Sequence, residues 1–372
     1  MEFPSAFDAR GLRLRPYRDS DVPVLVANGN DPDTLRFMSG NPGVITTETM
    51  RSWVGSSASR ARRNPDRLGY AVADPAGDEL LAGAVIHVTR RRSSAELGFW
   101  VAPAARGRGV ATTLTRALTD VCFARGLHRV EMFIRGENVR SQRVALAAGF
   151  RREGELRSVL PGAGSERHSA TLWSRLPADD DARTPRLLPD LPAGALTDAV
   201  VTLRPVGPDD VATLAALRGH TPAGTPGAPQ DRAALALHCA HAPARWLAGE
   251  RADVLVEGAA GEVAAELTLE YRDPEAGHAE IQAVLARGET APALAARGVE
   301  LLARWAFGIG VETLAATGTP DARLQDVLTR AGFSRLALLA ARPDTSASPP
   351  PGADAPGTDA RRPIVRRPAL RS

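Results

Sequence analysis

The sequence predicts two copies of a mixed α/β domain, joined by a short linker and followed by a disordered tail. Three observations lead there. The length of 372 residues suits two domains of roughly 150 residues each, patterns typical of strands alternate with patterns typical of helices, and one set of short signatures occurs twice. The hydrophobic share of 44% and the charged share of 24% are ordinary for a globular chain, so each copy can bury a core.

The repeated signatures keep the same order and nearly the same interval along the chain. LRP followed by DV recurs, as do AEL (later AEI) and AGF, and together these matches predict an internal duplication. The first members lie at 14–16 with 21–22, at 95–97 and at 148–150, and the second at 203–205 with 210–211, at 279–281 and at 331–333. We expect an active domain at 1–176, a linker at 177–197, a degenerate copy at 198–342 and a Pro/Arg-rich tail at 343–372.

The elements of the first copy follow from apolar periodicity and from helix-end residues. Alternating or β-branched runs predict strands, and apolar residues three or four apart predict helices. Helix starts are indicated by an Asp-Ser-Asp cluster and by glycines, and helix ends by Gly126 and Gly149. We expect strands at 12–16, 69–73, 80–89, 95–101 and 129–134. We expect helices at 22–29, 47–61, 110–125 and 141–148, and further strands after the last helix through residue 176.

The most informative stretch is a glycine-rich turn between a strand and a helix. It reads Arg106-Gly107-Arg108-Gly109-Val110-Ala111 after the strand AELGFWV. Such a turn aims successive backbone N–H groups at one point, and the helix behind adds its positive dipole end, so the place suits a pyrophosphate. It is neither a nucleotide P-loop, because no Gly-Lys-Ser/Thr follows, nor a dinucleotide fingerprint, whose glycines are spaced differently.

This stretch resembles the acetyl-coenzyme A signature of the GNAT acetyltransferase superfamily, (Gln/Arg)-x-x-Gly-x-(Gly/Ala), here Arg106-x-x-Gly109-x-Ala111. The resemblance implies a mostly antiparallel sheet with splayed middle strands and flanking helices in each copy, and acetyl-CoA as cosubstrate without a metal. It also implies that the coenzyme is bound by the residues of the turn, and that the backbone of Trp100 and Val101 polarises the acetyl carbonyl. Surface exposure is the alternative for the arginines, and for Arg108 we favour the ligand.

A second element supports the resemblance. Glu137-Asn138-Val139-Arg140-Ser141 is followed by Gly149-Phe150, as in the branch of ribosomal-protein alanine N-acetyltransferases. There the asparagine contacts the pantetheine arm, so Asn138 is a candidate coenzyme ligand. By themselves, Asn138 and Ser141 are also the residues of an ordinary helix cap.

Acetyl transfer to an amine needs a proton acceptor for the ammonium, N–H donors for the oxyanion and a proton donor for the thiolate. Glu96 is the candidate base; the alternative is an ion pair with one of the arginines at 90–92. Ser141 is the candidate acid. Many relatives use a tyrosine seven residues after the asparagine, but that position is Ala145, which leaves open that approximation alone carries much of the rate.

The second copy lacks these residues. At a constant offset, Glu289, Pro292 and Leu294 replace Arg106, Gly109 and Ala111, and proline lacks the amide that a phosphate needs. We therefore expect it not to bind coenzyme. His238, Cys239 and His241 lack a fourth ligand at a recognisable spacing, so we expect a buried cysteine with surface histidines and no metal site.

Charge and targeting features exclude other classes. The net charge is only +3, no apolar run is long enough for a bilayer span, and the first residues lack the basic then apolar order of a signal peptide. We expect a cytoplasmic protein without a membrane partner, and nucleic-acid binding through the tail arginines is the weaker interpretation. The predicted function is acetyl-CoA-dependent N-acetylation of a primary amine, on a protein N-terminus or a small molecule; the alternative is a non-catalytic acetyl-CoA sensor or scaffold.

Overall fold

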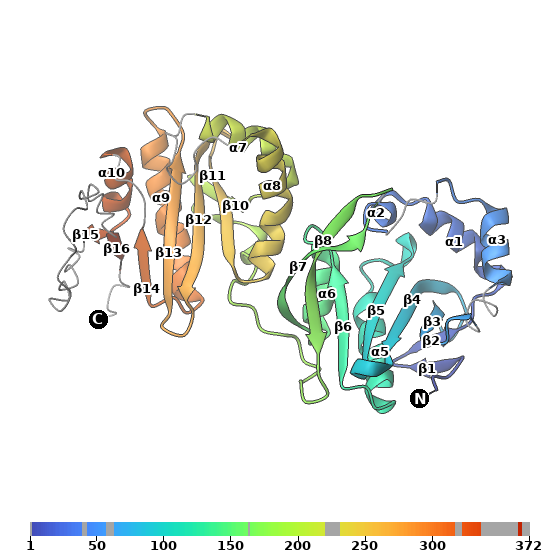
Figure 1. The fold of residues 1–372 in the computed structure, drawn as a ribbon. Coiled ribbons are helices and arrows are strands. Elements are labelled where there is room, and N and C mark those ends of the chain that lie inside the picture. Colours follow the sequence, from blue (N-terminus) through green and yellow to red (C-terminus); the bar gives the residue numbers. More distant parts are fainter. Residues whose placement is uncertain are drawn as a thin grey trace, which may run out of the picture. The chain divides into compact units, whose positions relative to one another are not determined.

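The structure is a computed structural model, and it describes residues 2–38, 43–56, 63–162, 164–219, 231–316, 322–335 and 364–366. The chain divides into two compact units, Met1–Pro185 and Arg186–Ser372, called here the first and the second unit (Figure 1). Each unit contains one sheet of eight strands. The predicted mixed α/β class with two sheets is confirmed.

The first unit alternates strands and helices in the predicted order. Its strands are β1 (Phe7–Ala9), β2 (Leu12–Arg15), β3 (Arg67–Ala73), β4 (Leu80–Thr89), β5 (Ser94–Val101), β6 (Arg129–Ile134), β7 (Arg151–Pro161) and β8 (Arg167–Arg175). Its helices are α1 (Val22–Gly29), α2 (Pro32–Leu35), α3 (Thr47–Gly55), α5 (Val110–Ala124) and α6 (Val139–Ala147), with short 3₁₀ turns η1 (Asp19–Asp21), η2 (Arg90–Arg92) and η3 (Pro103–Ala105). The helix expected at 141–148 starts two residues earlier, because Asn138 caps it.

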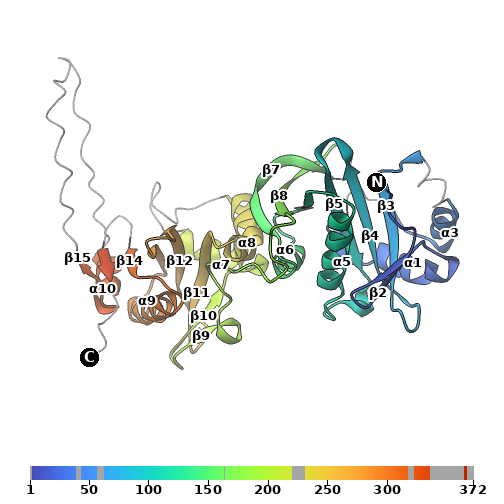
Figure 2. The ribbon, with the colours of Figure 1, turned by 90° about the horizontal axis from the view of Figure 1, so that it is seen from below.

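The first sheet has the strand order β1-β2-β3-β4-β5-β6-β8-β7. All neighbouring strands are antiparallel except β5 and β6, which run parallel. Helix α5 covers one face over β4, β5 and β6, while α1 and α3 pack together on the other face (Figure 2). The parallel pair therefore lies in the middle of the sheet, between two layers of helices.

Among the described residues, the second unit repeats the succession of strands of the first, with two helices instead of three between its second and third strands. Its strands are β9 (Leu196–Thr197), β10 (Val201–Pro205), β11 (Arg251–Gly258), β12 (Val263–Asp273), β13 (His278–Leu285), β14 (Thr313–Ala316), β15 (Ser334–Arg335) and β16 (Ile364–Arg366). Its helices are α7 (Val211–Arg218), α8 (Arg232–Leu247), α9 (Ala291–Gly308) and α10 (Ala322–Arg330), with 3₁₀ turns η4 (Pro192–Gly194) and η5 (Pro208–Asp210). The stretch at 221–229, expected to be a loop, lies outside the described residues.

The second sheet repeats the arrangement of the first. Its order is β9-β10-β11-β12-β13-β14-β16-β15, and the parallel pair is again in the middle, here β13 and β14. An apolar core under α9 fills one face, and a smaller core under α7 and α8 fills the other. The shared strand order is what a duplicated domain requires.

The repeated LRP…DV signature builds the same ion pair in each unit. Arg15 donates from Nη1 and Nη2 to Asp21 at 2.8 and 2.9 Å, and Arg204 contacts Asp210 in the same bidentate way at 2.9 and 2.8 Å. Each aspartate also accepts a backbone N–H three residues before it. The repeated arginine and aspartate therefore hold the end of a strand, β2 or β10, against the start of the following helix, α1 or α7.

The segment 177–197, expected as a linker, contains the boundary between the units after Pro185, and both of its halves make contacts. Thr184 donates from its amide to the carbonyl of Leu146 at 3.0 Å, so the first half packs on the first unit. Leu188 and Leu191 are buried in the core of the second unit, where Trp246 Nε1 donates to the carbonyl of Pro189 at 2.9 Å. Leucines between the prolines supply apolar anchors, so this segment is packed at both ends.

The tail at 343–372 was expected to be disordered, but a short part of it forms a strand. Residues Ile364–Arg366 form β16 between β14 and β15, and the rest of the tail lies outside the described residues. The β-branched pair Ile364-Val365 favours extended backbone, a local signal that the Pro-rich composition concealed. In the described part of the chain, no helix is both long and apolar enough to cross a membrane.

Candidate active site

The candidate site begins where the two parallel strands of the first sheet separate. The pairing of β5 with β6 covers Ser94 to Glu96 on one strand and Arg129 to Glu131 on the other. Both strands continue, β5 to Val101 and β6 to Ile134, without further pairing between them, and Figure 1 shows the two arrows diverging toward their tips. Beyond Glu96, one side of β5 thus has backbone groups that the sheet does not use.

The register of β4 and β5 determines which amides face this opening. The N–H of Ala102 donates to the carbonyl of Leu81, near the start of β4, at 2.9 Å. Because successive residues of a strand point their amides to opposite sides, Trp100 also faces β4, whereas Phe99 and Val101 face the opening. The geometry therefore favours Val101, and Phe99 with it, over the predicted backbone of Trp100.

The glycine turn leads from the end of β5 into helix α5. Gly107 and Gly109 have φ of +74° and +77°, a left-handed conformation that favours glycine. Thr113 donates to the carbonyl of Gly109 at 3.1 Å, so the amides of Val110 and Ala111 precede the first hydrogen bond of the helix and point out of its N-terminus. This is the backbone that a pyrophosphate needs.

The two arginines of the turn lie in different surroundings. The Arg106 guanidinium forms an ion pair with Asp31, the N-cap of α2, and donates to Thr34 Oγ1 at 3.0 Å. It therefore ties the turn to α2 and is not directed at a ligand. Arg108 is exposed, and no hydrogen bond or ion pair of its side chain occurs within the described ranges, so it stays the candidate phosphate contact.

Asn138 and Ser141 lie at the start of α6, beyond the end of β6. Asn138 Oδ1 accepts the amide of Ser141 at 3.1 Å, so Asn138 is a helix cap, the alternative left open by the sequence. The cap uses only the side-chain oxygen, which leaves the Asn138 amide group and the Ser141 hydroxyl for other partners. Both roles can therefore coexist.

Glu96 lies at the last paired position before the strands separate. Burial raises its pKa, and the carboxylate of Glu131 on β6 raises it further. The alternative ion pair with Arg90 to Arg92 is absent from the described contacts of Glu96, and Arg90 instead contacts Asp66 at 2.6 Å. A carboxyl with a raised pKa at the apex of the opening suits a general base.

An aromatic cluster borders the same face of the sheet. Glu96, Gly98 and Trp100 alternate on β5 and so share a face. Trp100 pairs with Gly83 on β4, and both the Trp100 indole and the Tyr17 hydroxyl occupy the space above Gly83. A Cβ added at Gly83 would clash with Trp100 Nε1 and with that hydroxyl. Tyr17 also contacts Trp53 edge to face at 4.9 Å between centroids.

The matching loop of the second unit is built differently. Helix α9 starts at Ala291, so Pro292 takes the place of Ala111 rather than that of Gly109; the loop before α9 is shorter, which shifts the constant offset. Thr290 occupies the position of Gly109, with φ of −80°. Arg323 from α10 donates to the carbonyls of Ala286 and Gly288 at 3.0 and 3.3 Å and so covers the loop.

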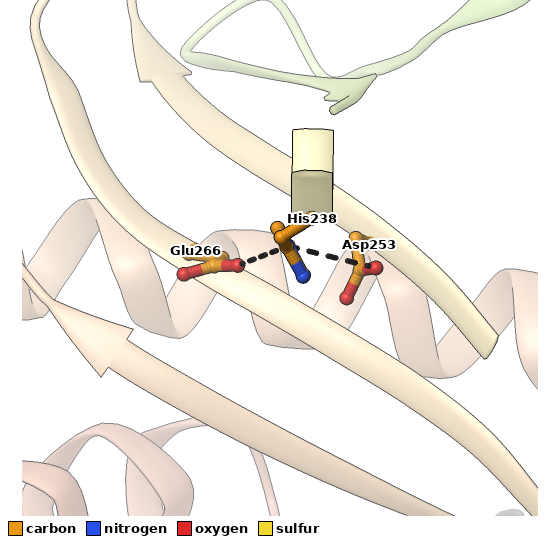
Figure 3. Close-up of side chains that lie close together, drawn as sticks. All are labelled: His238, Asp253 and Glu266. Carbon is orange, nitrogen blue, oxygen red and sulfur yellow. Dashed lines mark ion pairs between the residues drawn. The ribbon is translucent and has the colours of Figure 1, made fainter. Parts of the chain in front are cut away.

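In the second unit, charged side chains fill the face that the first unit lines with aromatic rings. His238 Nε2 lies 3.6 Å from Glu266 and 3.9 Å from Asp253. Figure 3 shows His238 between the two carboxylates. The surface position expected for His238 is therefore wrong, because these carboxylates give it buried partners; Cys239 is buried, as expected.

The group His238, Asp253 and Glu266 contains donor atoms close enough for a metal ion. However, Arg218 Nε donates to Glu266 at 2.8 Å and Arg251 Nε donates to Asp253 at 3.0 Å. Both carboxylates are thus already balanced by arginines, and a divalent cation would have to displace the guanidinium of Arg218. The donor set fits an ion network better than a metal site.

Sequence reasoning missed three features of the first site: the amide of Phe99, the carboxylate of Glu131 and the pairing of Arg106 with Asp31. The alternation along β5 was a usable signal for Phe99, because only every second amide faces a given neighbour. The other two depend on which strands and helices are neighbours, and nothing local in the sequence indicates that.

Comparisons with known proteins agree with this geometry. The family described as "Acetyltransferase (GNAT) domain" matches residues 11–151. The chain is 32% identical over 152 residues to phosphinothricin N-acetyltransferase of Streptomyces coelicolor, covering 40% of this chain and 86% of that protein. It is 35% identical over 108 residues to mycothiol acetyltransferase of Beutenbergia cavernae, covering 29% of this chain and only 35% of that protein.

Solved structures with similarity include Mycobacterium smegmatis RimJ in complex with CoA-disulfide, with 26% identity, 46% of this chain and 85% of that one covered, and a TM-score of 0.40. Ribosomal-protein-S5-alanine acetyltransferase from Vibrio fischeri has 20% identity, 47% and 98% coverage and a TM-score of 0.39. The relative that is 32% identical and covered over 86% of its length shows the family, and the family match agrees with it: the chain belongs to the GNAT acetyltransferase family.

Proposed function

We propose that the first unit transfers an acetyl group from acetyl-CoA to a primary amine, and that the second unit does not bind the coenzyme. The observation that carries the proposal is the separation of β5 from β6 directly after Glu96. Within the described residues, it leaves the amides of Phe99 and Val101 without a strand partner, beside a glycine turn at a helix N-terminus. Unpaired backbone donors next to an anion site suit a thioester that carries a pyrophosphate.

Each step of the transfer has a residue for it in this proposal. The amides of Gly109, Val110 and Ala111, with Arg108, hold the phosphates, and Asn138 contacts the pantetheine arm. Bound acetyl-CoA supplies the thioester whose carbonyl the amine attacks. The amides of Val101 and Phe99 stabilise the oxygen, Glu96 accepts a proton from the ammonium, and Ser141 donates one to the leaving sulfur.

The acceptor class is a primary amine, and we propose a protein or peptide N-terminal α-amine as the first candidate. The second signature, Asn138 with Ser141 three residues later, is the basis for this choice. The relative that is largely covered is an acetyltransferase named for phosphinothricin, so small amines are the second candidate. Its name applies to that protein, and phosphinothricin belongs in the same screen.

The test combines calorimetric titration of acetyl-CoA with turnover on a set of N-terminal peptides and small amines. We expect one site per chain and turnover of at least one acceptor class. Gly109→Ala should weaken binding at least about tenfold, because a Cβ in the phosphate cradle blocks close approach. Binding without turnover on any amine would support the sensor instead, and no binding would refute the proposal.

A matched control separates the site from helix strain. Gly126, at the other end of α5, has φ of +80°, and an added Cβ would have no neighbouring atom within 4 Å there, as at Gly109. Gly126→Ala therefore imposes the same backbone strain on the same helix. We expect it to leave acetyl-CoA affinity unchanged, and an equal loss in both variants would show that the effect comes from the helix and not from the cradle.

A further inference from the structure

A continuous row of polar residues crosses the first sheet at the point where β5 and β6 separate. In register, Arg67 pairs with His87, His87 with Glu96, Glu96 with Glu131, and Glu131 with Ser174. Registered neighbours project from the same face of a sheet. Glu96 therefore has a titratable side chain on each side, and the row runs through the apex of the opening.

The two glutamates of the row have different surroundings. Arg129 Nε donates to Glu131 Oε1 at 2.6 Å, and the same guanidinium donates from Nη1 to Glu153 at 2.9 Å. Glu96 is half-buried and has no ion pair among the described residues. One carboxylate is thus fixed by a cation, and its neighbour is left with none.

On the β4 side of Glu96, the row consists of His87 and Arg67, neither of which carries a negative charge. Burial lowers the pKa of His87, and Arg67, its neighbour on β3, lowers it further. His87 therefore adds no negative charge beside Glu96, whereas the carboxylate of Glu131 raises the pKa of Glu96. The charged and titratable groups around Glu96 in the sheet are Arg67, His87, Glu131 and, behind Glu131, Arg129 and Glu153.

We propose that Glu131 is a positioning residue: held by Arg129, its carboxylate lies beside Glu96 and keeps that group basic enough to accept the proton of the acceptor ammonium. This inference rests on the proposed function, in which Glu96 is the base. Pairs of carboxyl groups whose environments push their proton affinities apart are a recurrent way to assign acid–base roles.

The proton balance is simple. The ammonium transfers one proton to the Glu96 carboxylate, and the free amine forms the new C–N bond as the C–S bond breaks. The nitrogen then loses a second proton, which ends on the sulfur of coenzyme A. Glu96 returns the first proton to solvent, so one proton is released per acetyl group transferred.

The test is the pH profile of kcat/KM for the acceptor in five variants, of which three alter Glu131 or its partner Arg129. Glu131→Gln removes the negative charge and should move the acid limb about one unit to lower pH. Arg129→Gln removes the cation and should move the limb to higher pH. Glu131→Asp keeps the charge and should restore the limb close to its original position, which a merely structural role of the side chain would not explain.

Glu153→Gln is the matched control. It removes a carboxylate from the same guanidinium but does not face Glu96 in the register, so its limb should move much less than that of Glu131→Gln. The acceptor's own ionisation is common to all variants and cancels in the comparison. An unmoved limb in Glu131→Gln, or equal movement in Glu153→Gln, would overturn the inference.

Glu96→Gln distinguishes this failure from that of the proposed function. If the limb disappears in Glu96→Gln but stays in place in Glu131→Gln, Glu96 is the base and only the role of Glu131 is refuted. If Glu96→Gln keeps both the limb and the rate, the base assignment is refuted and the inference falls with it. Calorimetric binding of acetyl-CoA to each variant checks that the fold and the coenzyme site persist.

Discussion

At the strand position where the first unit has Gly83, the second unit has Glu266. Each pairs with the residue four positions after the glutamate of the repeated AEL or AEI signature, Trp100 in one unit and Val284 in the other. Gly83 leaves room for the Trp100 indole and the Tyr17 hydroxyl. Glu266 instead points a charge into the same layer of the fold.

The last residue of the helix that follows the second strand of each unit also differs. Helix α1 ends at Gly29, and the corresponding helix α7 ends at Arg218, whose guanidinium binds Glu266. Burial alone would raise the pKa of Glu266, but hydrogen bonds from His238 and Arg218 lower it to about 2. The same strand order therefore supports either a face lined by aromatic rings or a face filled by an ion network.

The largest expected difference between the units is in activity. Glu96→Gln should lower kcat by about 10² to 10³ fold, because it removes the proton acceptor. Glu280→Gln alters the equivalent position of the second unit, where the glutamate forms an exposed ion pair with Arg272, and should leave turnover unchanged. Steady-state kinetics on the best acceptor measures both, and equal losses would contradict a silent second unit.

The ion network of the second unit should matter for stability and not for catalysis. Arg218→Met leaves Glu266 buried without its guanidinium and should cost the second unit about 3–5 kcal/mol. Arg10→Met, at an exposed pair with Asp120 in the first unit, should cost at most about 1 kcal/mol. Urea unfolding of the full chain, followed by hydrogen exchange in each unit, measures both losses; similar values would argue against the buried network.

The aromatic face of the first unit should not tolerate a single added methyl group. Gly83→Ala places a carbon against Trp100 Nε1 and the Tyr17 hydroxyl and should destabilise the first unit by about 1–3 kcal/mol. On the neighbouring strand, a Cβ at Gly69 meets only the carbonyl of Ala84 at 4.0 Å. Gly69→Ala should therefore have little effect on the thermal midpoint. A Gly83→Ala protein as stable as Gly69→Ala would show that the aromatic face of the first unit is not tightly packed.

The smallest predicted effect is a pH dependence of the second unit. The pKa of Glu266 is lower in the folded unit than in the unfolded chain. The ionised carboxylate therefore adds to the free energy of unfolding above the ordinary carboxyl pKa, and this contribution is lost as the pH falls toward 2. By pH 4 only the beginning of this loss should be seen, at most about 1 kcal/mol. Denaturant titrations at pH 7 and pH 4 measure it, and Glu266→Gln should remove this contribution.

Local signals predicted much of the fold from the sequence. The duplication, the strands around the glycine turn and the helix after Gly109 were all visible, because periodicity and turn residues act over a few positions. The Arg–Asp pair behind the LRP…DV signature explains why these particular letters recur in both units. The linker leucines and β16 were missed, since their partners lie far away in sequence.

The same limit applies to the candidate site. Gly109 and Asn138 could be found from spacing, whereas the proximity of Glu131 to Glu96 depends on a parallel strand pairing between distant segments. The constant offset aligned Pro292 with Gly109, whereas the structure aligns it with Ala111, two residues later. The offset ignores that the loop before α9 is shorter. Sequence spacing identified the candidate residues, and the sheet register decided which of them are neighbours.

Hydrogen exchange of the intact protein with and without acetyl-CoA tests the central claim, that one unit binds the coenzyme and the other does not. We predict slower exchange of the amides at 107–112 and at the start of α6, with no change in the second-unit peptides over 286–294. Protection of the second unit's loop, or of neither loop at saturating acetyl-CoA, would contradict the account.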